Sequence, residues 1–447
     1  MFAQSVTQRA RHLGRALRGA AALIAAALCA ALAAGPPAAA RSRGPDLRIF
    51  YRSPVLVRAG ERVRIPVDVA CATAAGRACR AAATLAAPDS EGTWRSSTAR
   101  GRPGVVFDVT APAARIANGP GGGGALRYRL SARAADGRTA SLPPGRGALR
   151  LYVTSGMRRV ELGEIRRFPH VDRTVVLQLP WGTGPYRAGL SPGNEAATVG
   201  PSSFDVDARG RIFLLDPLQH RIAVFDGDRL VRQIPVAATP ESDLALGADG
   251  VMHVAAQHEG SVSVQSLSAA GHRLERRRLG TGILGEIRTA GARAYVHVLP
   301  LDAWIPADRS GGTARAGLPL PDRGLLLQSI VGRGVRLGIA AGTHVRRPIE
   351  VDAPPPVGGL GMADRDDRGG LWAAFREAPS ASHPDGRSLA VHVAADGSIR
   401  RFAMPARTFA DQRAFSQIRL GRDGRLYQLR TFPSGMRIVR YDTEEGS

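Results

Sequence analysis

Histidine is the residue type whose placement in this sequence could do chemistry. Four histidines fall in predicted loops, each in a different repeating unit of the chain. Because imidazole titrates near neutral pH, a convergent group could bind a transition metal or act as general acid and base. Scattered histidines also fall in loops by chance, so we name these as ligand-binding candidates and predict no metal, cofactor or catalytic residue. The candidates are His220, His258, His344 and His383.

A second candidate is the long polar connection that begins at Trp181 and runs to Asn194 and Glu195. Binding residues are common on loops that a rigid scaffold positions. We expect this connection to contact the ligand at the rim of a binding face. A plain linker is the alternative.

A repeat in the sequence predicts the scaffold that positions these loops. Turn glycines recur about every 40 residues from residue 210 onward, a period typical of propellers and solenoids. The markers suggest six units, and they are Gly210, Gly250, Gly291, Gly332, Gly369 and Gly424.

Each unit contains short alternating apolar runs separated by tight turns, the pattern of a four-stranded antiparallel sheet. In the first unit the runs are 203–206, 211–215, 221–225 and 230–234, whereas the last unit has only three runs. The run 173–179 alternates and has no other partner, so we predict that it completes the last sheet. Closing the ring protects exposed sheet edges. The predicted fold is all-β, with a six-bladed β-propeller over residues 170–447.

The first unit also resembles a known repeat. Residues 200–226 have a Gly-Pro start, a strand ending in Val206 and Asp207, a turn at Gly210, a strand ending in Asp216, and an Arg-Ile-Ala-Val-Phe strand. This pattern resembles the NHL repeat from Trp181 to about residue 234, and later units keep only the turn and the second strand. The resemblance implies a platform that binds protein, RNA or carbohydrate. A minority of related propellers are hydrolases or lyases, and the fold does not choose among these functions.

The first 40 residues have the pattern of a secretory signal. Arginines precede an Ala/Leu-rich core at 19–35, and small residues at 38–40 offer a cleavage site. The core is shorter than the ~20 residues that a spanning helix needs, so we predict cleavage, with retention as a membrane anchor as the alternative. No other stretch is long and apolar enough to span a bilayer. We therefore expect a protein that is secreted or associated with the cell envelope.

Residues 46–155 are predicted to form a small antiparallel β-sandwich, because short alternating strands are separated by turns rich in Gly and Pro. The stretch 124–137 resembles a strand of immunoglobulin-like and fibronectin type III modules around Tyr128. Cys71 and Cys79 flank a short loop in this region, and in an oxidising compartment we expect them to form a disulfide.

The charge of the chain is strongly positive. It carries 61 basic against 38 acidic residues, a net charge of +23, and all of the basic residues are arginine. Arginine forks match phosphate and carboxylate, so a surface that binds polyanions is one interpretation. A genome rich in G and C explains the same bias, and the scattered arginines favour that explanation.

Together these observations favour an exported binding or scaffold protein whose propeller loops hold a protein or carbohydrate partner. They leave the question of catalysis open while favouring its absence. The alternative is a metal-assisted lyase or hydrolase on the propeller loop face.

Overall fold

The computed structural model describes residues 47–51, 55–71, 81–86, 105–110, 123–142, 149–162, 173–191, 198–299, 303–308, 314–331, 334–352, 357–377, 387–405, 409 and 417–442. Almost all of them lie in strands or turns, which confirms the all-β class. Within these ranges no helix is long and apolar enough to cross a membrane. The predicted signal lies outside the described residues, as do Cys79, Asn194, Glu195 and His383, so the export signal, the Cys71–Cys79 disulfide and the roles of those three side chains stay predictions.

Two N-terminal sheets share one hydrophobic core. The first has the strand order β1-β3-β5, and the second has β2-β8-β6-β4 with β7 paired to β6. Within this shared core, Tyr51 of the first sheet lies beside Tyr128 of the second, and their hydroxyls are 2.6 Å apart. The strands are β1 (Leu47–Tyr51), β2 (Leu56–Arg58), β3 (Arg62–Cys71), β4 (Ala81–Ala86), β5 (Val105–Thr110), β6 (Gly123–Ala134), β7 (Thr139–Leu142) and β8 (Leu149–Thr154).

The rest of the described chain forms six sheets, which we number I to VI along the chain. Sheet I contains β11 (Ser203–Val206), β12 (Ile212–Asp216), β13 (Arg221–Asp226) and β14 (Arg229–Pro235), and sheet II contains β15 (Ser242–Leu246), β16 (Met252–His258), β17 (Ser261–Leu267) and β18 (Arg273–Thr281). Sheet III contains β19 (Ile283–Ala290), β20 (Arg293–Leu299) and β21 (Ala303–Pro306). Sheet IV contains β22 (Leu318–Pro319), β23 (Leu325–Val331), β24 (Gly334–Ala341) and β25 (His344–Asp352), with β9 (Arg158–Glu161) added in parallel to β25. Sheet V contains β26 (Val357–Arg365), β27 (Leu371–Glu377), β28 (Arg387–Val393) and β29 (Ile399–Pro405). Sheet VI contains β30 (Ile418–Leu420), β31 (Leu426–Phe432), β32 (Gly435–Tyr441) and β10 (Arg173–Pro180).

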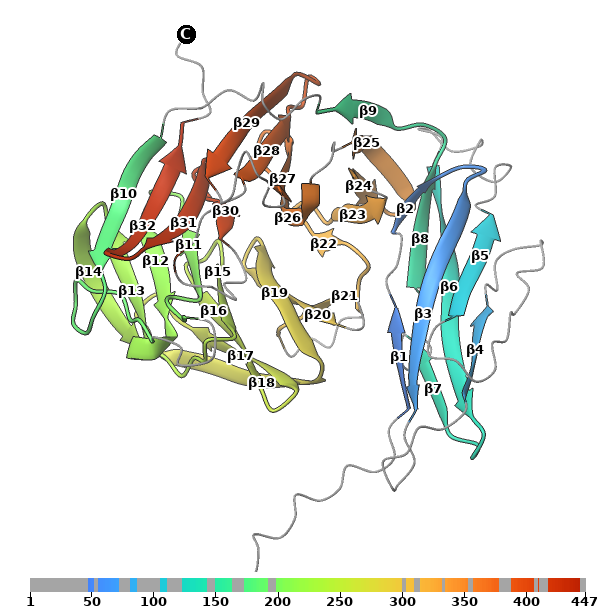
Figure 1. Ribbon diagram of the computed structural model, residues 1–447, viewed down its shortest axis with the longest axis horizontal. Coiled ribbons are helices and arrows are strands. Elements are labelled where there is room, and N and C mark those ends of the chain that lie inside the picture. Colours follow the sequence, from blue (N-terminus) through green and yellow to red (C-terminus); the bar gives the residue numbers. More distant parts are fainter. Residues whose placement is uncertain are drawn as a thin grey trace, which may run out of the picture. The chain divides into compact units, whose positions relative to one another are not determined.

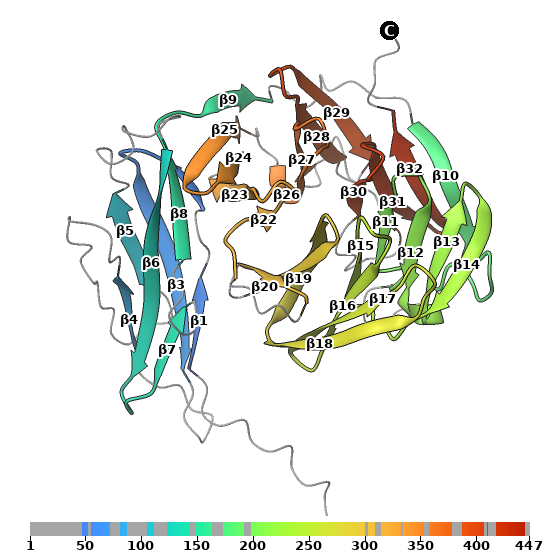
Figure 2. The ribbon, with the colours of Figure 1, turned by 180° about the vertical axis from the view of Figure 1, so that it is seen from behind.

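The six sheets form a closed β-propeller (Figures 1 and 2). Neighbouring sheets contact one another in sequence through their inner strands, and β11 of sheet I also contacts β30 of sheet VI. Strand β10 pairs antiparallel with β32, so a segment from the start of the propeller completes its last sheet. The sheet order therefore brings residues near 175 beside residues near 438.

Residues in and beside β2, a strand of the second N-terminal sheet, contact sheet IV. The Ser329 hydroxyl accepts hydrogen bonds from the backbone N–H groups of Val55 and Leu56, at 2.6 and 2.7 Å. Arg336 donates to Glu61 at 2.6 Å and to Glu350 at 2.7 Å. These contacts join the segment around β2 to β23 and β24.

The turn glycines explain most of the repeat. Gly210, Gly250, Gly369 and Gly424 all have φ between +78° and +83° in turns that join the first and second strands. Glycine adopts this conformation without the strain that a Cβ introduces. In sheet IV the corresponding turn lies between β22 and β23, and Gly332 instead falls between β23 and β24, outside the described residues. The marker chosen for the fourth unit was therefore wrong, although the unit itself exists.

Candidate functional site

The two sides of the propeller differ in the segments they carry. We call the side with the first-to-second-strand turns, such as 207–211 and 366–370, the turn face. The opposite side carries the second-to-third-strand loops, such as 217–220, and the connections between sheets, and we call it the loop face. The candidate binding residues predicted from the sequence were expected on the loop face.

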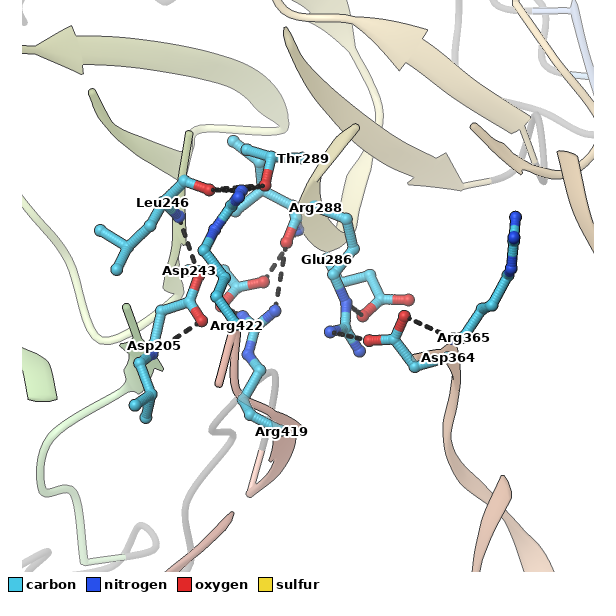
Figure 3. Close-up of polar contacts among 12 residues, drawn as sticks. Asp205, Asp243, Leu246, Glu286, Arg288, Thr289, Asp364, Arg365, Arg419 and Arg422 are labelled. Atoms are coloured by element: carbon cyan, nitrogen blue, oxygen red, sulfur yellow. Dashed lines mark hydrogen bonds and ion pairs between the residues drawn. The ribbon is translucent and has the colours of Figure 1, made fainter. Parts of the chain in front are cut away.

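Carboxylates on the inner strands join neighbouring sheets around the axis (Figure 3). Asp205 of sheet I accepts hydrogen bonds from the N–H groups of Val206 and Leu246, both at 2.8 Å. Asp243 of sheet II makes the equivalent contacts with Leu244 and Ile287, at 2.9 and 2.8 Å. Each carboxylate thus satisfies one backbone donor of its own strand and one of the next sheet.

Arginines cross the axis from sheet VI to sheets II and III. Arg419 donates to the Asp243 carboxylate at 2.7 Å and to the Leu244 carbonyl at 2.9 Å. Arg422 donates to Thr289 Oγ1 at 2.7 Å and to the carbonyl of Leu246. The centre of the ring is therefore occupied by paired side chains (Figure 3).

A second ionic group on the axis involves Arg288. Its guanidinium bridges Glu286 at 2.9 Å and Asp364 of sheet V at 3.0 Å. Burial alone would raise the pKa of Glu286, but Arg288 and Arg419 hold that pKa below its ordinary value. Burial raises the pKa of Asp364 despite Arg288. Both carboxylates accept from Arg288, and the buried site shifts their pKa values in opposite directions.

A pocket of about 780 Å³ lies on the turn face. Its lining comes from the turns and strand ends of sheets I, V and VI. Charged side chains dominate it, namely Arg209, Arg368, Arg400, Arg422, Arg425, Arg440, Asp226, Asp366, Asp367, Asp423 and Asp442. A smaller cavity of about 130 Å³ shares Arg422 and Asp366 with this pocket and reaches Arg288 and Arg419 near the axis.

Several pocket carboxylates already accept hydrogen bonds from their own sheets. Asp366 accepts from the Gly370 N–H and from His392 Nε2, both at 2.7 Å. Asp423 accepts from the Tyr427 hydroxyl at 2.5 Å. Asp442 pairs with Arg440 at 2.9 Å. These carboxylates brace turns and strand ends.

Two pocket arginines are differently placed. Arg209 and Arg425 are exposed, and neither side chain makes a hydrogen bond or ion pair with another residue in the described part of the chain. Because a guanidinium offers five N–H donors, both side chains can bind an anionic group that enters the pocket.

The predicted histidines do not converge in the described structure. His220 is exposed at the end of the 3₁₀ turn η2 (Pro217–Gln219), and His258 is exposed beside Glu259 at 3.9 Å. Both lie at second-to-third-strand loops of the loop face. His344 follows the third-to-fourth-strand turn of sheet IV and so lies on the turn face. The expectation of a shared face fails for His344 because the wrong glycine marked the fourth unit.

The connection at Trp181 is held by specific contacts on the loop face. Trp181 Nε1 donates to the Phe432 carbonyl at 2.8 Å, and Arg187 donates to the Trp181 carbonyl at 3.1 Å. Buried Asp216 accepts from the Gly189 N–H and Gln219, both at 2.9 Å, and burial raises the pKa of its carboxyl. These contacts anchor the connection against sheets I and VI.

The turn-face residues were not among the sequence candidates, which lie on other loops and include neither Arg209 nor Arg425. A usable signal was present, since Arg209 and Arg425 flank the turn glycines Gly210 and Gly424 in units I and VI. The contact of β11 with β30, including the Arg422 N–H that donates to the Val206 carbonyl at 3.1 Å, brings these two turns together. Across the described residues, no three His, Cys, Asp or Glu side chains are grouped as a metal site would need.

No protein family matches the sequence, and neither does any curated protein. Several solved structures are similar in fold. A catalytically inactive virginiamycin B lyase from Staphylococcus aureus with quinupristin has 10% identity and a TM-score of 0.36, covering 57% of this chain and 98% of that one. The gluconolactonase XC5397 from Xanthomonas campestris has 13% identity and a TM-score of 0.34, covering 60% and 99%. TolB from Acinetobacter baumannii has 9% identity and a TM-score of 0.24, covering 90% and 97%. At these values no residue role transfers to this chain.

Proposed function

We propose that this protein is an exported, non-catalytic binding protein that holds a carboxylate-bearing partner, a protein or a glycan, in the turn-face pocket. Export rests on the signal-like first 40 residues, and the resemblance of the first unit to an NHL repeat supports a binding platform. The stretch 124–137, which resembles a strand of immunoglobulin-like modules, is consistent with an extracytoplasmic protein.

The proposal rests on one observation: two carboxylates of the pocket already accept hydrogen bonds, whereas two of its arginines donate none to any described residue. Asp366 and Asp423 already accept hydrogen bonds from their own sheets, whereas Arg209 and Arg425 are exposed at the turns of sheets I and VI. Exposed Asp367 also lines the pocket and makes no side-chain hydrogen bond or ion pair within the described residues, so an incoming ligand meets two uncommitted guanidiniums and one uncommitted carboxylate. Charge-assisted hydrogen bonds to carboxylates are stronger than neutral ones.

The test uses the mature chain with two labelled probes, poly-L-glutamate and polygalacturonate, followed by fluorescence anisotropy at low salt. We expect the Arg209→Gln/Arg425→Gln variant to lose at least about tenfold in affinity for the probe that binds, since two charge-assisted contacts are removed. Binding of one probe alone would identify the partner as protein or glycan.

The matched control is Arg273→Gln/Arg276→Gln, which removes the same charge from exposed positions on β18 of sheet II. This control separates a specific site from the general attraction of a chain with a net charge of +23. Equal losses in both double variants, or no loss in the first, would contradict the proposal.

A further inference from the structure

Two like-charged residues face each other on sheet VI. Arg430 of β31 lies directly opposite Arg437 of β32 in the antiparallel pairing. Like charges in this arrangement destabilise a sheet. Within the described ranges, neither guanidinium forms an ion pair with a carboxylate. The pair therefore has a cost that no described counter-charge offsets.

An aromatic ring holds both guanidiniums. The Arg430 guanidinium carbon lies 4.9 Å from the centre of the Phe432 ring, and that of Arg437 lies 4.8 Å from it. A cation over an aromatic face is attracted by the ring quadrupole. Phe432 therefore fixes the positions of the two cations and supplies no negative charge.

Burial raises the free-energy cost of leaving the Arg430 guanidinium without a hydrogen-bond partner among the described residues. Its Nε is excluded from solvent and has no hydrogen-bond partner among the described residues. Burial lowers the pKa of Arg430, Tyr441 partly opposes this shift, and the charges of Arg173 and Arg437 lower the pKa further. The Arg430 side chain therefore lies in a locally positive environment.

Arg376 of sheet V is linked to β31 through Gln417. Side chains alternate along a strand, so Arg376 lies on the same side of β27 as Trp372 and Ala374. That side of β27 packs against sheet VI, at Leu426 and Val439. Arg430 and Arg437 project from the same side of sheet VI as Leu426 and Val439. Arg376 donates to Gln417 at 2.8 Å, and the Gln417 carbonyl accepts from the N–H of Leu429, the residue before Arg430.

We infer that Arg430 and Arg437, supported by Phe432, form a binding site for an oxyanion, a carboxylate or a phosphate group. Two forks on neighbouring strands can share the oxygens of one such group. The bound charge offsets the repulsion between the two arginines. This site is separate from the turn-face pocket and does not depend on the proposed function.

The experiment measures thermal unfolding and calorimetric titration of the mature chain with inorganic phosphate and with acetate, each against sodium chloride at equal ionic strength. We expect at least one oxyanion to raise the Tm of the wild-type chain and to bind with measurable heat. Arg437→Gln should weaken binding at least about tenfold, the loss of one charge-assisted contact. Arg430→Lys keeps the charge and removes the fork, so it should bind more weakly than the wild type.

The control Arg273→Gln changes net charge equally at an exposed position of sheet II and should respond like the wild type. A response to phosphate alone indicates a phosphate group as the natural ligand, and a response to acetate indicates a carboxylate. The inference is overturned if neither anion acts differently from chloride, or if Arg437→Gln and Arg430→Lys, both shown folded by circular dichroism, keep the wild-type affinity.

Discussion

Arg419 of sheet VI donates to Asp243 of sheet II across the propeller axis at 2.7 Å, and the two side chains are 1% and 0% exposed. The pair joins strands that are 176 residues apart in sequence. Ser203 Oγ also donates to the same carboxylate at 2.6 Å. The axis of this propeller is thus held by a polar network whose members come from both ends of the ring.

Replacing Arg419 by methionine is expected to destabilise the protein by about 3 kcal/mol, because removal of one partner leaves Asp243 as a buried, uncompensated charge. The measurement is the urea midpoint followed by circular dichroism. Arg229→Gln serves as the control, since the exposed Arg229–Asp226 pair should contribute less than about 1 kcal/mol. A midpoint shift of the same size in both variants would show that the axial pair has no special role.

Closure of the ring depends on Gly435, which has φ +153° at the start of β32. An added Cβ would lie 2.9 Å from the Cα of Pro180 and closer still to the Leu179 carbonyl oxygen. Gly435→Ala should therefore disturb the β10–β32 pairing and cost about 2 kcal/mol or more. Gly342→Ala is the matched control, because Gly342 has φ +67° with open space around it and should cost only about 1 kcal/mol. Tm values of the two variants would test the difference, and equal shifts would contradict it.

The contact between the β2 segment and sheet IV depends on Ser329, which is 2% exposed. Ser329→Ala leaves the N–H groups of Val55 and Leu56 without their acceptor and should cost about 1–3 kcal/mol. Limited proteolysis should then cut the chain near Val55 and Leu56 faster than in the wild type. Ser398→Ala, at an exposed turn, should leave the cleavage rate unchanged. Unchanged cleavage in Ser329→Ala would show that this contact contributes little.

The sequence predicted the sheets well because strand alternation and positive-φ turns are local signals. The strands at 203–206 and 221–226 and the turn at Gly210 follow from a few neighbouring residues each. The first turn of the fourth unit differs, since Arg323, with φ +64°, occupies the position in the β22–β23 turn where the other units have a positive-φ glycine. A non-glycine residue in that conformation leaves no sequence marker.

The site could not be predicted in the same way. The pairings of Arg419 with Asp243 and of Arg288 with Asp364 depend on how the ring closes, which no local pattern contains. The same holds for Arg430 and Arg437, which are recognisable as a pair only once the register of β31 and β32 is known. Because arginine is abundant in the sequence, residue type alone does not distinguish these arginines from the others.

Asp366 gives the protein a stability term that depends on pH. It accepts hydrogen bonds from the Gly370 N–H, His392 Nε2 and Trp372 Nε1. Burial alone would raise the pKa of this carboxyl, but the hydrogen bonds outweigh burial and hold the pKa below its ordinary value of 3.8. A carboxyl whose pKa is lowered by folding stabilises the native state above the unfolded-state pKa, and this contribution is lost as the pH falls through the folded-state pKa.

Asp366→Asn should therefore lower the Tm most at neutral pH, and the gap between wild type and variant should shrink as the pH falls below about 4. Differential scanning fluorimetry between about pH 7 and about pH 3 measures this gap. The exposed neighbour Asp367 provides the control, since Asp367→Asn should give a small gap that changes little over the same range. A wild-type advantage over Asp366→Asn that is as large at low pH as at neutral pH would show that the ionised carboxylate is not what braces the β26–β27 turn.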